Sequence, residues 1–301
     1  MIYFPTQNLF IEGPDCSGKT SLVSKIHKIT NYKWHIHDRS QISRSIFANL
    51  YNRDIHDLKN VVHNELSNLN NRFIFLLPEF KIIKERYSER GDEIHDSLES
   101  IQKVYEAFKK SEKIFKNFPN VMIYKEPEVL KNADMISTSI HLSENCMLRE
   151  IAEYVYNFTN ACSNKESYPL SFTIYDDCKF EESNSNIMKY HREAEYYDTI
   201  YKKLHSKISR ELSGKNEYNR KESIDSRRFV YSDDSCISFI QISIRDNIMD
   251  FNSVLRSSNV EKTFEYDLNF LYYLASTCYK RLGLECDYVR MRFNLNSAHI
   301  I

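Results

Sequence analysis

The sequence is poor in glycine, which makes each glycine informative. Only 5 of the 301 residues are glycine, beside 6 prolines and a single tryptophan. Glycine adopts left-handed and other unusual backbone conformations more readily than any other residue, so five glycines leave few places for such turns. We therefore expect closely spaced glycines to mark a specialised loop.

The chain also lacks an excess of charge of either sign and a long apolar run. Lys and Arg number 41 against 42 Asp and Glu, for a net charge of -1, which excludes a uniformly basic nucleic-acid coat but leaves room for a local basic patch. No run approaches the ~20 apolar residues of a membrane span, and the first residues lack the features of a signal peptide. We expect a cytoplasmic protein (host cytoplasm if the gene is viral) with no membrane partner.

Cysteine pairs with close spacing are absent as well. The seven cysteines contain no CxxC pair and are scattered along the chain: Cys16, Cys146, Cys162, Cys178, Cys236, Cys278 and Cys286. An odd, scattered set favours reduced thiols in a cytosolic compartment over a disulfide framework. The same spacing argues against a zinc site.

Two domains are predicted from the length and from a change of pattern along the chain. In the first part, apolar strand candidates at 9–11, 32–37, 72–77 and 121–124 alternate with helical patterns at 21–30, 42–50, 81–90 and 97–118. This alternation predicts an α/β fold, a doubly wound parallel sheet with helices on both faces. We assign residues 1–135 to this domain.

The second part, residues 136–301, has the mixed pattern of an α+β domain. Residues 138–223 are polar and are predicted to be mostly helical, with loops near 163–169 and 213–222. Strand patterns then follow at 236–244, 249–255 and 288–293, around an apolar helix at 268–282 that ends at Gly283, a suitable C-cap.

The segment from Gly13 to Thr20 matches the pattern G-x-x-x-x-G-K-[ST]. It follows an apolar strand and precedes a helix, the context in which backbone N–H groups cradle phosphate oxygens at a helix N-terminus. Lys19 would neutralise the β- and γ-phosphates and the Thr20 hydroxyl would bind Mg²⁺, so ATP or GTP binding is predicted. The predicted nucleotide-binding residues are Gly13, Ser17, Gly18, Lys19, Thr20 and Ser21.

Candidate residues for the phosphoryl acceptor follow the next strand. Asp38 and Arg39 lie at its carboxyl end, the edge where ligands of parallel sheets bind. A carboxylate there can accept a hydroxyl proton or hold metal through water, and an arginine can bind phosphate. Farther on, Arg86 and Arg90 belong to a basic helical stretch that can close over a transferring phosphoryl group. A solvated helix face fits that stretch equally well.

Residues 8–128 resemble the thymidylate kinase/deoxynucleoside kinase family. The resemblance rests on FIEGPDCSGKTSL, HIHDRSQISRSIF and FIFLLPEFKIIKERYSERGDEIHDSLESIQKVYEAF. It implies ATP and Mg²⁺ as cofactors, a substrate-side role for Asp38 and Arg39, and lid roles for Arg86 and Arg90. The DRS segment follows Thr20 sooner than in thymidylate kinases. That spacing is closer to polynucleotide 5′-hydroxyl kinases, in which an acid activates a hydroxyl.

A second group of candidate residues lies near the C-terminus. Arginines surround a cysteine in the order Ser226-Arg227-Arg228, Cys236, Gln241 and Arg256-Ser257. Arginines and a serine can surround a monophosphate. A cysteine beside such charge is a candidate nucleophile, although a buried and inert thiol is the common alternative.

Residues 187–301 resemble thymidylate synthase and deoxycytidylate hydroxymethylase, on the order of SRR, Cys236, Gln241, Arg256-Ser257 and Asp267. The resemblance implies catalysis by Cys236, substrate binding by Gln241, Arg256 and Ser257, and base recognition by Asp267, which suits a cytosine amino group. His299 would face the sugar hydroxyl. Arg227 and Arg228 would reach the neighbouring subunit's phosphate, which implies a homodimer. The folate-contacting segment of that family is missing, so folate is not expected as a cofactor.

Together these patterns predict an ATP-dependent kinase of a small pyrimidine deoxynucleotide or deoxynucleoside, fused to a thymidylate-synthase-like domain. Three alternatives stay open: a kinase acting on a hydroxyl of DNA, a nucleotide-sensing binding protein without catalysis, and an active thymidylate synthase or hydroxymethylase.

Overall fold

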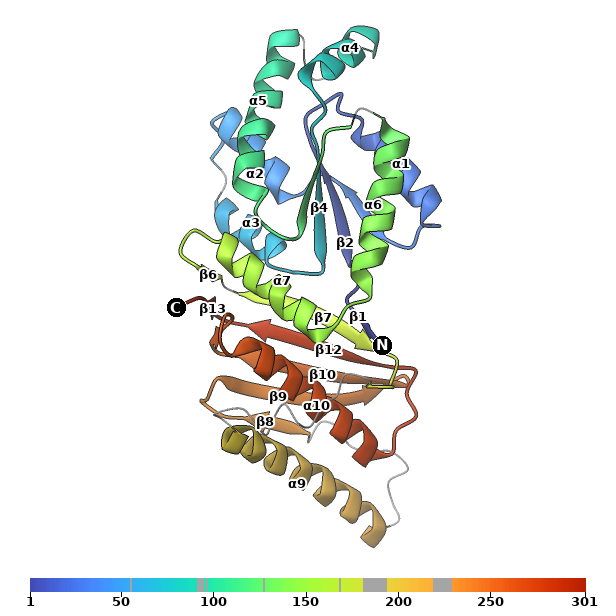
Figure 1. Ribbon diagram of the computed structural model, residues 1–301, viewed down its shortest axis with the longest axis vertical. Coiled ribbons are helices and arrows are strands. Elements are labelled where there is room, and N and C mark those ends of the chain that lie inside the picture. Colours follow the sequence, from blue (N-terminus) through green and yellow to red (C-terminus); the bar gives the residue numbers. More distant parts are fainter. Residues whose placement is uncertain are drawn as a thin grey trace. The chain divides into compact units, whose positions relative to one another are not determined.

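The chain forms two compact units in a computed structural model, and each unit is described separately (Figure 1). The structure describes residues 1–54, 56–90, 95, 97–126, 128–167, 169–180, 194–218 and 229–301. One unit is Thr6–Glu144, and the other combines Met1–Pro5 with Asn145–Ile301. We call Thr6–Glu144 the phosphate-loop unit and the other the second unit. The phosphate-loop unit is inserted into the chain of the second unit. It extends beyond residue 135 to include the helix α6 (Val129–Glu144).

A four-stranded parallel sheet forms the centre of the unit Thr6–Glu144. Its strands are arranged in the order β3 (His35–Asp38), β2 (Asn8–Glu12), β4 (Asn71–Leu76) and β5 (Val121–Tyr124). Every residue of β4 is buried, as the continuous apolar run indicated. In the register of β2 with β3, Ile11 lies opposite Asp38, which places the end of β3 beside the end of β2. The predicted α/β fold with a parallel sheet is confirmed.

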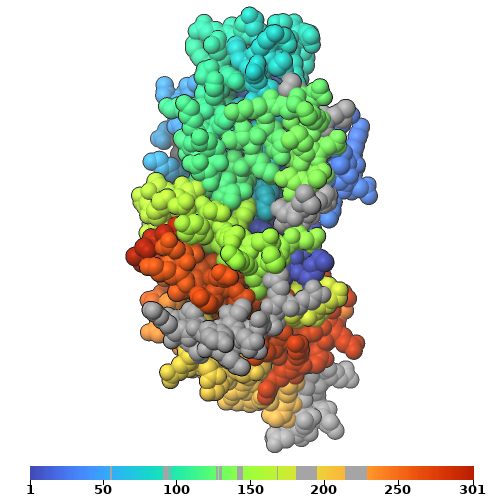
Figure 2. All heavy atoms as spheres, in the orientation of Figure 1, coloured from blue at the N-terminus to red at the C-terminus, as the bar shows by residue number. Residues whose placement is uncertain are grey.

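Helices cover both faces of this sheet. On one face, apolar residues of β2 and β4 pack with α1 (Lys19–Ile29) and α6, whereas on the other Phe75 stacks on Phe115 of α5 (Leu98–Phe115) with ring centroids 6.0 Å apart. Figure 2 shows the side chains of α5 and α6 closing over strands that are visible between them in Figure 1. The remaining helices are α2 (Gln41–Leu50), α3 (Leu58–Leu66) and α4 (Phe80–Arg90), of which α3 was not predicted.

The second unit contains a mixed six-stranded sheet. Its order is β1 (Ile2–Tyr3), β7 (Leu170–Asp176), β12 (Tyr288–Leu295), β10 (Ile248–Leu255), β9 (Ile237–Arg245) and β8 (Val230–Ser232), and only the pair β10–β12 is parallel. A smaller sheet joins β11 (Ser258–Asn259), β13 (Ala298–His299) and β6 (Glu166–Ser167). The helices among the described residues of this unit are α7 (Leu148–Ala161), α9 (Ala194–Tyr218) and α10 (Phe264–Leu282).

Two expectations for this unit were wrong, whereas the strands predicted at 236–244, 249–255 and 288–293 and the helix predicted at 268–282 are confirmed as β9, β10, β12 and α10. The segment that contains β7 was predicted to be mostly helical, but its alternate residues Leu170, Phe172 and Ile174 are buried as one face of a strand. Residues 213–218, predicted to be a loop, continue α9. Gly283 caps α10 in the left-handed conformation, with φ of 61°, as predicted. No helix in the described part of the chain is long and apolar enough to cross a membrane.

Candidate phosphate-binding site

The loop between β2 and α1 has a backbone that requires glycine at its first position. Gly13 has φ of +149°, and a Cβ atom there would lie 2.5 Å from the carbonyl oxygen of Leu76 and 3.0 Å from Ser17 Oγ. Any side chain would therefore push the loop away from the end of β4. Gly18 has φ of +99° and precedes the first residue of α1. Both glycines of the sequence motif thus occupy positions with a structural need for glycine.

The N-terminus of α1 is available to an anion. Gly18 supplies no side-chain cap, and the first turn of the helix carries no acidic residue. The first N–H groups of a helix lack partners within the helix and carry a partial positive charge, so an anion placed there is stabilised. Thr20 and Ser21, in this first turn, line a cavity of about 300 Å³.

Lys19 is a buried cation at the same helix terminus. Its side chain is only 7% exposed, and its Nζ donates a hydrogen bond of 2.8 Å to the carbonyl oxygen of Pro14. Burial and the charge of Arg39 lower the pKa of Lys19 to about 8. The carboxylates of Asp15 and Asp38 raise this pKa, but they do not outweigh burial. The ammonium group is therefore poorly compensated, and a phosphate would stabilise it.

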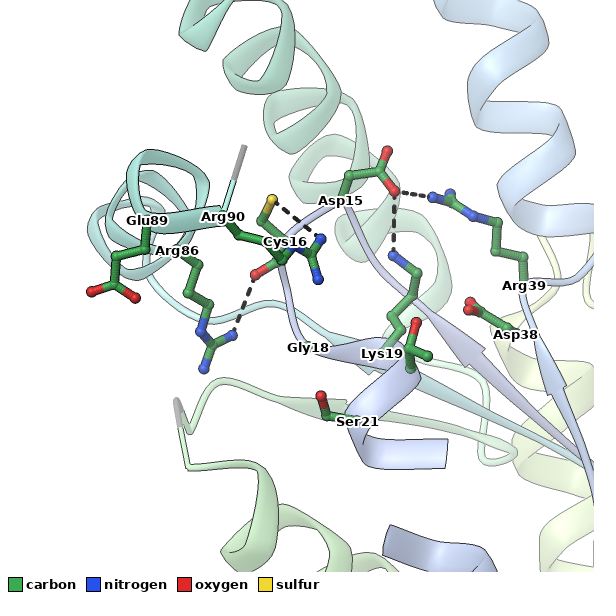
Figure 3. A pocket seen from close by; sticks show the side chains of 11 residues that line it. Asp15, Cys16, Gly18, Lys19, Ser21, Asp38, Arg39, Arg86, Glu89 and Arg90 are labelled. Carbon is green, nitrogen blue, oxygen red and sulfur yellow. Dashed lines mark hydrogen bonds and ion pairs between the residues drawn. The ribbon is translucent and has the colours of Figure 1, made fainter. Parts of the chain in front are cut away.

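Asp15 collects three basic side chains around its carboxylate. Arg39 and Lys19 approach Oδ1, with the Lys19 Nζ at 3.7 Å, and His95 Nε2 lies 3.1 Å from Oδ2. Figure 3 shows Lys19 and Arg39 approaching the same oxygen of this carboxylate from two directions. Burial raises the pKa of Asp15, but the charges of Lys19 and Arg39 and the His95 hydrogen bond outweigh burial and leave it below its ordinary value. Asp15 is therefore ionised at neutral pH.

Two arginines of α4 reach the loop from the other side. Arg86 donates to the carbonyl oxygens of Ser17, at 2.7 Å, and Cys16, at 3.4 Å. Arg90 Nη2 lies 3.8 Å from Cys16 Sγ. Both arginines line the cavity together with Glu89 of the same helix (Figure 3). Cations from α4 and from the end of β3 thus surround the space above the N-terminus of α1.

Most of the residues predicted for the kinase site meet at this one cavity. Its wall is formed by Asp15, Cys16, Gly18, Lys19, Thr20, Ser21, Asp38, Arg39, Arg86, Glu89 and Arg90. The predicted residues Gly13 and Ser17 are buried behind this wall and shape the loop. Asp38 is exposed, whereas Arg39 adopts φ of 78° and places its guanidinium 4.7 Å from the centre of the Phe47 ring.

Glu12 and His95 are site residues that the sequence interpretation missed. Glu12, the last residue of β2, is fully buried. Its Oε2 accepts a hydrogen bond from Ser43, and its Oε1 has no hydrogen-bond partner among the described residues. Burial raises the pKa of Glu12. Hydrogen bonds from Ser40 and Ser43 and the charge of Arg39 lower this pKa, but burial has the larger effect. An acid that ends an apolar strand directly before a phosphate loop is a signal in the sequence, but His95 has no comparable local signal.

The cavity wall offers few protein oxygen atoms that could hold a metal ion. Among the described residues, no group of three or more His, Cys, Asp or Glu side chains is placed to hold a metal. The Thr20 hydroxyl and the Asp38 carboxylate line the same wall. Magnesium sites of this kind use one or two protein oxygens and complete the coordination with phosphate oxygens and water.

The second group of predicted residues lies in the second unit, apart from Arg227 and Arg228, which fall outside the described residues. Cys236 is exposed and directly precedes β9, and Gln241 lies half-buried within that strand. The Arg256 backbone N–H donates to the Cys236 carbonyl oxygen at 2.8 Å. Ser257 Oγ lies 3.5 Å from His299 Nδ1. The fold thus gathers four of the predicted residues, Cys236, Arg256, Ser257 and His299, around β11 and β13.

Asp267, the residue predicted to recognise a base, is engaged inside the second unit. It is 4% exposed. Its Oδ1 accepts a hydrogen bond from the Tyr197 hydroxyl at 2.8 Å, and its Oδ2 accepts one from Ser258 Oγ at 3.2 Å. Both carboxylate oxygens of Asp267 therefore already accept hydrogen bonds from protein hydroxyl groups.

Comparison with known proteins gives no match to a family model and no match to a curated protein. Among solved structures, the chain is similar to deoxyadenosine kinase from M. mycoides, solved with the products dCMP and a flexible dCDP. The identity is 13% over 46% of this chain and 100% of that chain, with a TM-score of 0.36. It is also similar to thymidylate synthase from T4 phage, at 17% identity over 31% of this chain and 34% of that chain, with a TM-score of 0.25. The structural neighbours thus include a deoxynucleoside kinase and a thymidylate synthase.

Proposed function

We propose that the unit Thr6–Glu144 is a P-loop kinase that transfers the γ-phosphoryl group of ATP to a hydroxyl group of a pyrimidine deoxynucleotide or deoxynucleoside. The observation that carries the proposal is the cavity at the N-terminus of α1. Lys19 and three arginines, Arg39, Arg86 and Arg90, line it or point into it. Preorganised cations around the space where charge develops are the main requirement for phosphoryl transfer.

The donor phosphates would replace contacts that the loop makes with itself. Lys19 Nζ donates to the Pro14 carbonyl oxygen and lies near Asp15, and its ammonium group would turn to the phosphate oxygens instead. The N–H groups at the start of α1 would bind the same phosphates. Arg86 and Arg90 would stabilise the charge of the transferring group. Magnesium, held by Thr20 and the phosphates, would supply further positive charge to the β- and γ-phosphates when ATP is bound.

The acceptor would approach along the end of β3. Two exposed carboxylates line the cavity, Asp38 at the end of β3 and Glu89 of α4. An acceptor hydroxyl that approaches along β3 would be oriented or deprotonated by Asp38. Nη1 of Arg39 is buried and has no hydrogen-bond partner among the described residues, which leaves a donor for an acceptor oxygen. The cavity, at about 300 Å³, has the volume of a small-molecule site.

The test is a panel of acceptors offered to the full chain with γ-labelled ATP and Mg²⁺. The panel contains dTMP, dUMP, dCMP, the corresponding deoxynucleosides and a single-stranded DNA with a free 5′-hydroxyl group. We expect label on a small deoxynucleotide or deoxynucleoside and none in the Lys19→Ala variant. If only the DNA becomes labelled, the acceptor is a hydroxyl group of DNA and not a small deoxynucleotide or deoxynucleoside. No transfer to any acceptor would refute the kinase proposal.

For the second unit, we propose binding of a pyrimidine deoxynucleoside monophosphate at β11 and β13. The observation that favours it is the gathering of Cys236, Arg256, Ser257 and His299 there. We expect saturable binding of dUMP or dCMP that Arg256→Ala abolishes. Release of tritium from carbon 5 of the base, lost in Cys236→Ser, would indicate cysteine-dependent transfer. Binding without release would indicate a sensor, and no binding would refute both.

A further inference from the structure

One segment of the chain holds three consecutive residues of the phosphate loop. Arg86 donates to the Ser17 carbonyl oxygen, Arg90 contacts Cys16 Sγ, and His95 contacts Asp15. The two arginines extend into the cavity, whereas His95 does not line it and is 3% exposed. The imidazole therefore contacts the loop at the Asp15 carboxylate from outside the cavity wall.

The His95 ring is fixed at every polar position that the structure describes. Nε2 lies 3.1 Å from Asp15 Oδ2, and Nδ1 lies 2.9 Å from Ser100 Oγ in α5. The His95 carbonyl oxygen accepts a hydrogen bond of 3.1 Å from the Tyr87 hydroxyl in α4. Because an ionised carboxylate only accepts hydrogen bonds, Nε2 carries a proton toward Asp15. The ring thus joins α5 to the phosphate loop, and the backbone carbonyl of the same residue is held by α4.

A carboxylate in a phosphate-binding loop works against phosphate binding unless its charge is held elsewhere. Asp15 lies beside Lys19, with Oδ1 3.7 Å from the Lys19 Nζ. Like charges repel strongly at a site with little water, and a free carboxylate oxygen also competes with phosphate for the same N–H and ammonium donors. Arg39 occupies Oδ1, so Oδ2 is the oxygen that needs a second partner.

Building on the kinase proposed above, we infer that His95 is a positioning residue that holds the Asp15 carboxylate away from the donor phosphates and keeps Lys19 available to them. Without the imidazole, Oδ2 would be free to turn toward Lys19 and the N-terminus of α1. Removal of the imidazole would therefore weaken nucleotide binding more than it slows the transfer step. The groups proposed to act on the transferring phosphoryl group would stay in place, namely Asp38, Arg86 and Arg90.

The expected effects distinguish this role from a merely structural one. His95→Ala should weaken binding of ATP·Mg²⁺ about tenfold, the loss expected for one hydrogen bond to a charged group, and should raise KM for ATP with a smaller change in kcat. His95→Gln retains an amide donor that can reach Asp15 and should restore most of the affinity. In the Asp15→Asn background no charge needs holding, so His95→Ala should there have little further effect.

The experiment is an equilibrium titration of a fluorescent ATP analogue, with Mg²⁺, into the full chain and its variants. The matched control is His27→Ala, which removes a histidine from the last turn of α1. This variant should bind the ATP analogue like the wild type. Thermal unfolding of each variant checks that it is folded. If His95→Ala fails to fold, His95→Asn and His95→Gln replace it, since only the longer side chain can reach Asp15.

The outcomes separate this inference from the kinase proposal. A wild-type chain that does not bind the analogue refutes the proposed function. A wild-type chain that binds it, with His95→Ala binding equally well, overturns the positioning role and leaves the kinase intact. Equal losses from His95→Ala in the wild-type and Asp15→Asn backgrounds would also overturn it, because His95 would then act independently of Asp15.

Discussion

The two units use buried charged residues in opposite ways. In the phosphate-loop unit, Lys19 donates to a carbonyl oxygen of its own loop, a partner that a ligand can replace. In the second unit, Asp267 and Asp176 accept hydrogen bonds from the buried hydroxyls of Tyr197 and Tyr272. These partners belong to the core and complete its hydrogen bonding. Buried charge therefore indicates a ligand site only where its partners are replaceable.

The largest effect that can test this contrast comes from Lys19. Lys19→Ala should reduce phosphoryl transfer by about 100- to 1000-fold, the range for loss of one preorganised charge-stabilising donor. The folded state should not be destabilised, because the change removes a buried cation that is poorly compensated. Initial rates with labelled ATP and urea unfolding measure the two quantities. Lys28→Ala, an exposed lysine of the same helix, is the control and should match the wild type.

Asp267 should give the reverse result. Asp267→Ala leaves the Tyr197 and Ser258 hydroxyls without their acceptor in the core, so the free energy of unfolding should fall by about 2–3 kcal/mol. The affinity of ATP for the other unit should be unchanged. Urea unfolding and nucleotide titration on the same preparation measure both. Unchanged stability, together with a loss of dCMP binding, would instead make Asp267 a ligand residue like Lys19. Glu265→Ala, at an exposed acidic residue of the first turn of α10, is the matched control.

The pKa of Lys19 predicts how nucleotide affinity depends on pH. With a pKa of about 8 in the ligand-free protein, Lys19 is charged at pH 7 and mostly neutral at pH 9. Phosphates bind the charged form, so affinity is greatest below pH 8 and falls above it. The Kd for ATP·Mg²⁺ should rise about tenfold between pH 7 and 9. A flat profile over that range would mean that Lys19 either does not titrate between pH 7 and 9 or does not bind the phosphates, and Lys19→Ala would distinguish the two by losing affinity only if Lys19 binds them.

The smallest effect is expected from His205 in the second unit. His205 of α9 is buried beside Thr277 and Cys278 of α10, and burial, together with the charge of Arg281, lowers its pKa to about 4. The folded state favours the neutral ring, so its contribution is fully present above the ordinary pKa of 6.5 and is lost as pH falls toward 4.

Lowering the pH from 7 to 5 should therefore reduce the Tm of the second unit more in the wild type than in His205→Gln. The difference should be roughly 2–4 °C, corresponding to about 1 kcal/mol for a unit of this length. Scanning calorimetry at the two pH values measures it. Equal Tm shifts in both proteins would show that His205 is not the group that titrates.

The turn between β2 and α1 could be predicted from the sequence because its determinants are local. Two glycines at a fixed spacing, a lysine and a hydroxyl residue specify the turn between a strand and a helix. The contact of His95 with Asp15 joins residues 80 positions apart, and no local pattern marks it. Its geometry depends on where α4 and α5 pack, which only the folded unit determines.

The second unit shows the same limit for strands. The alternation of Leu170, Phe172 and Ile174 is a local signal, but it lies within a polar segment and was overlooked. What makes it a strand is pairing with β12, where Phe172 lies opposite Phe293. The prediction that Asp267 recognises a base was based on a sequence spacing that resembles a known family. In the structure, Asp267 accepts a hydrogen bond from Tyr197 of α9. Spacing along the chain does not reveal that a hydroxyl from a distant helix already binds the acid.

The pairing of β1 with β7 has a consequence for synthesis on the ribosome. Ile2 is synthesised before the inserted unit, whereas its partner Asp176 follows only after the whole of that unit. At 5–20 residues per second, the first strand waits on the order of ten to thirty seconds for its neighbour. The phosphate-loop unit can fold during that interval, whereas the sheet that begins with Ile2 is the last to be completed.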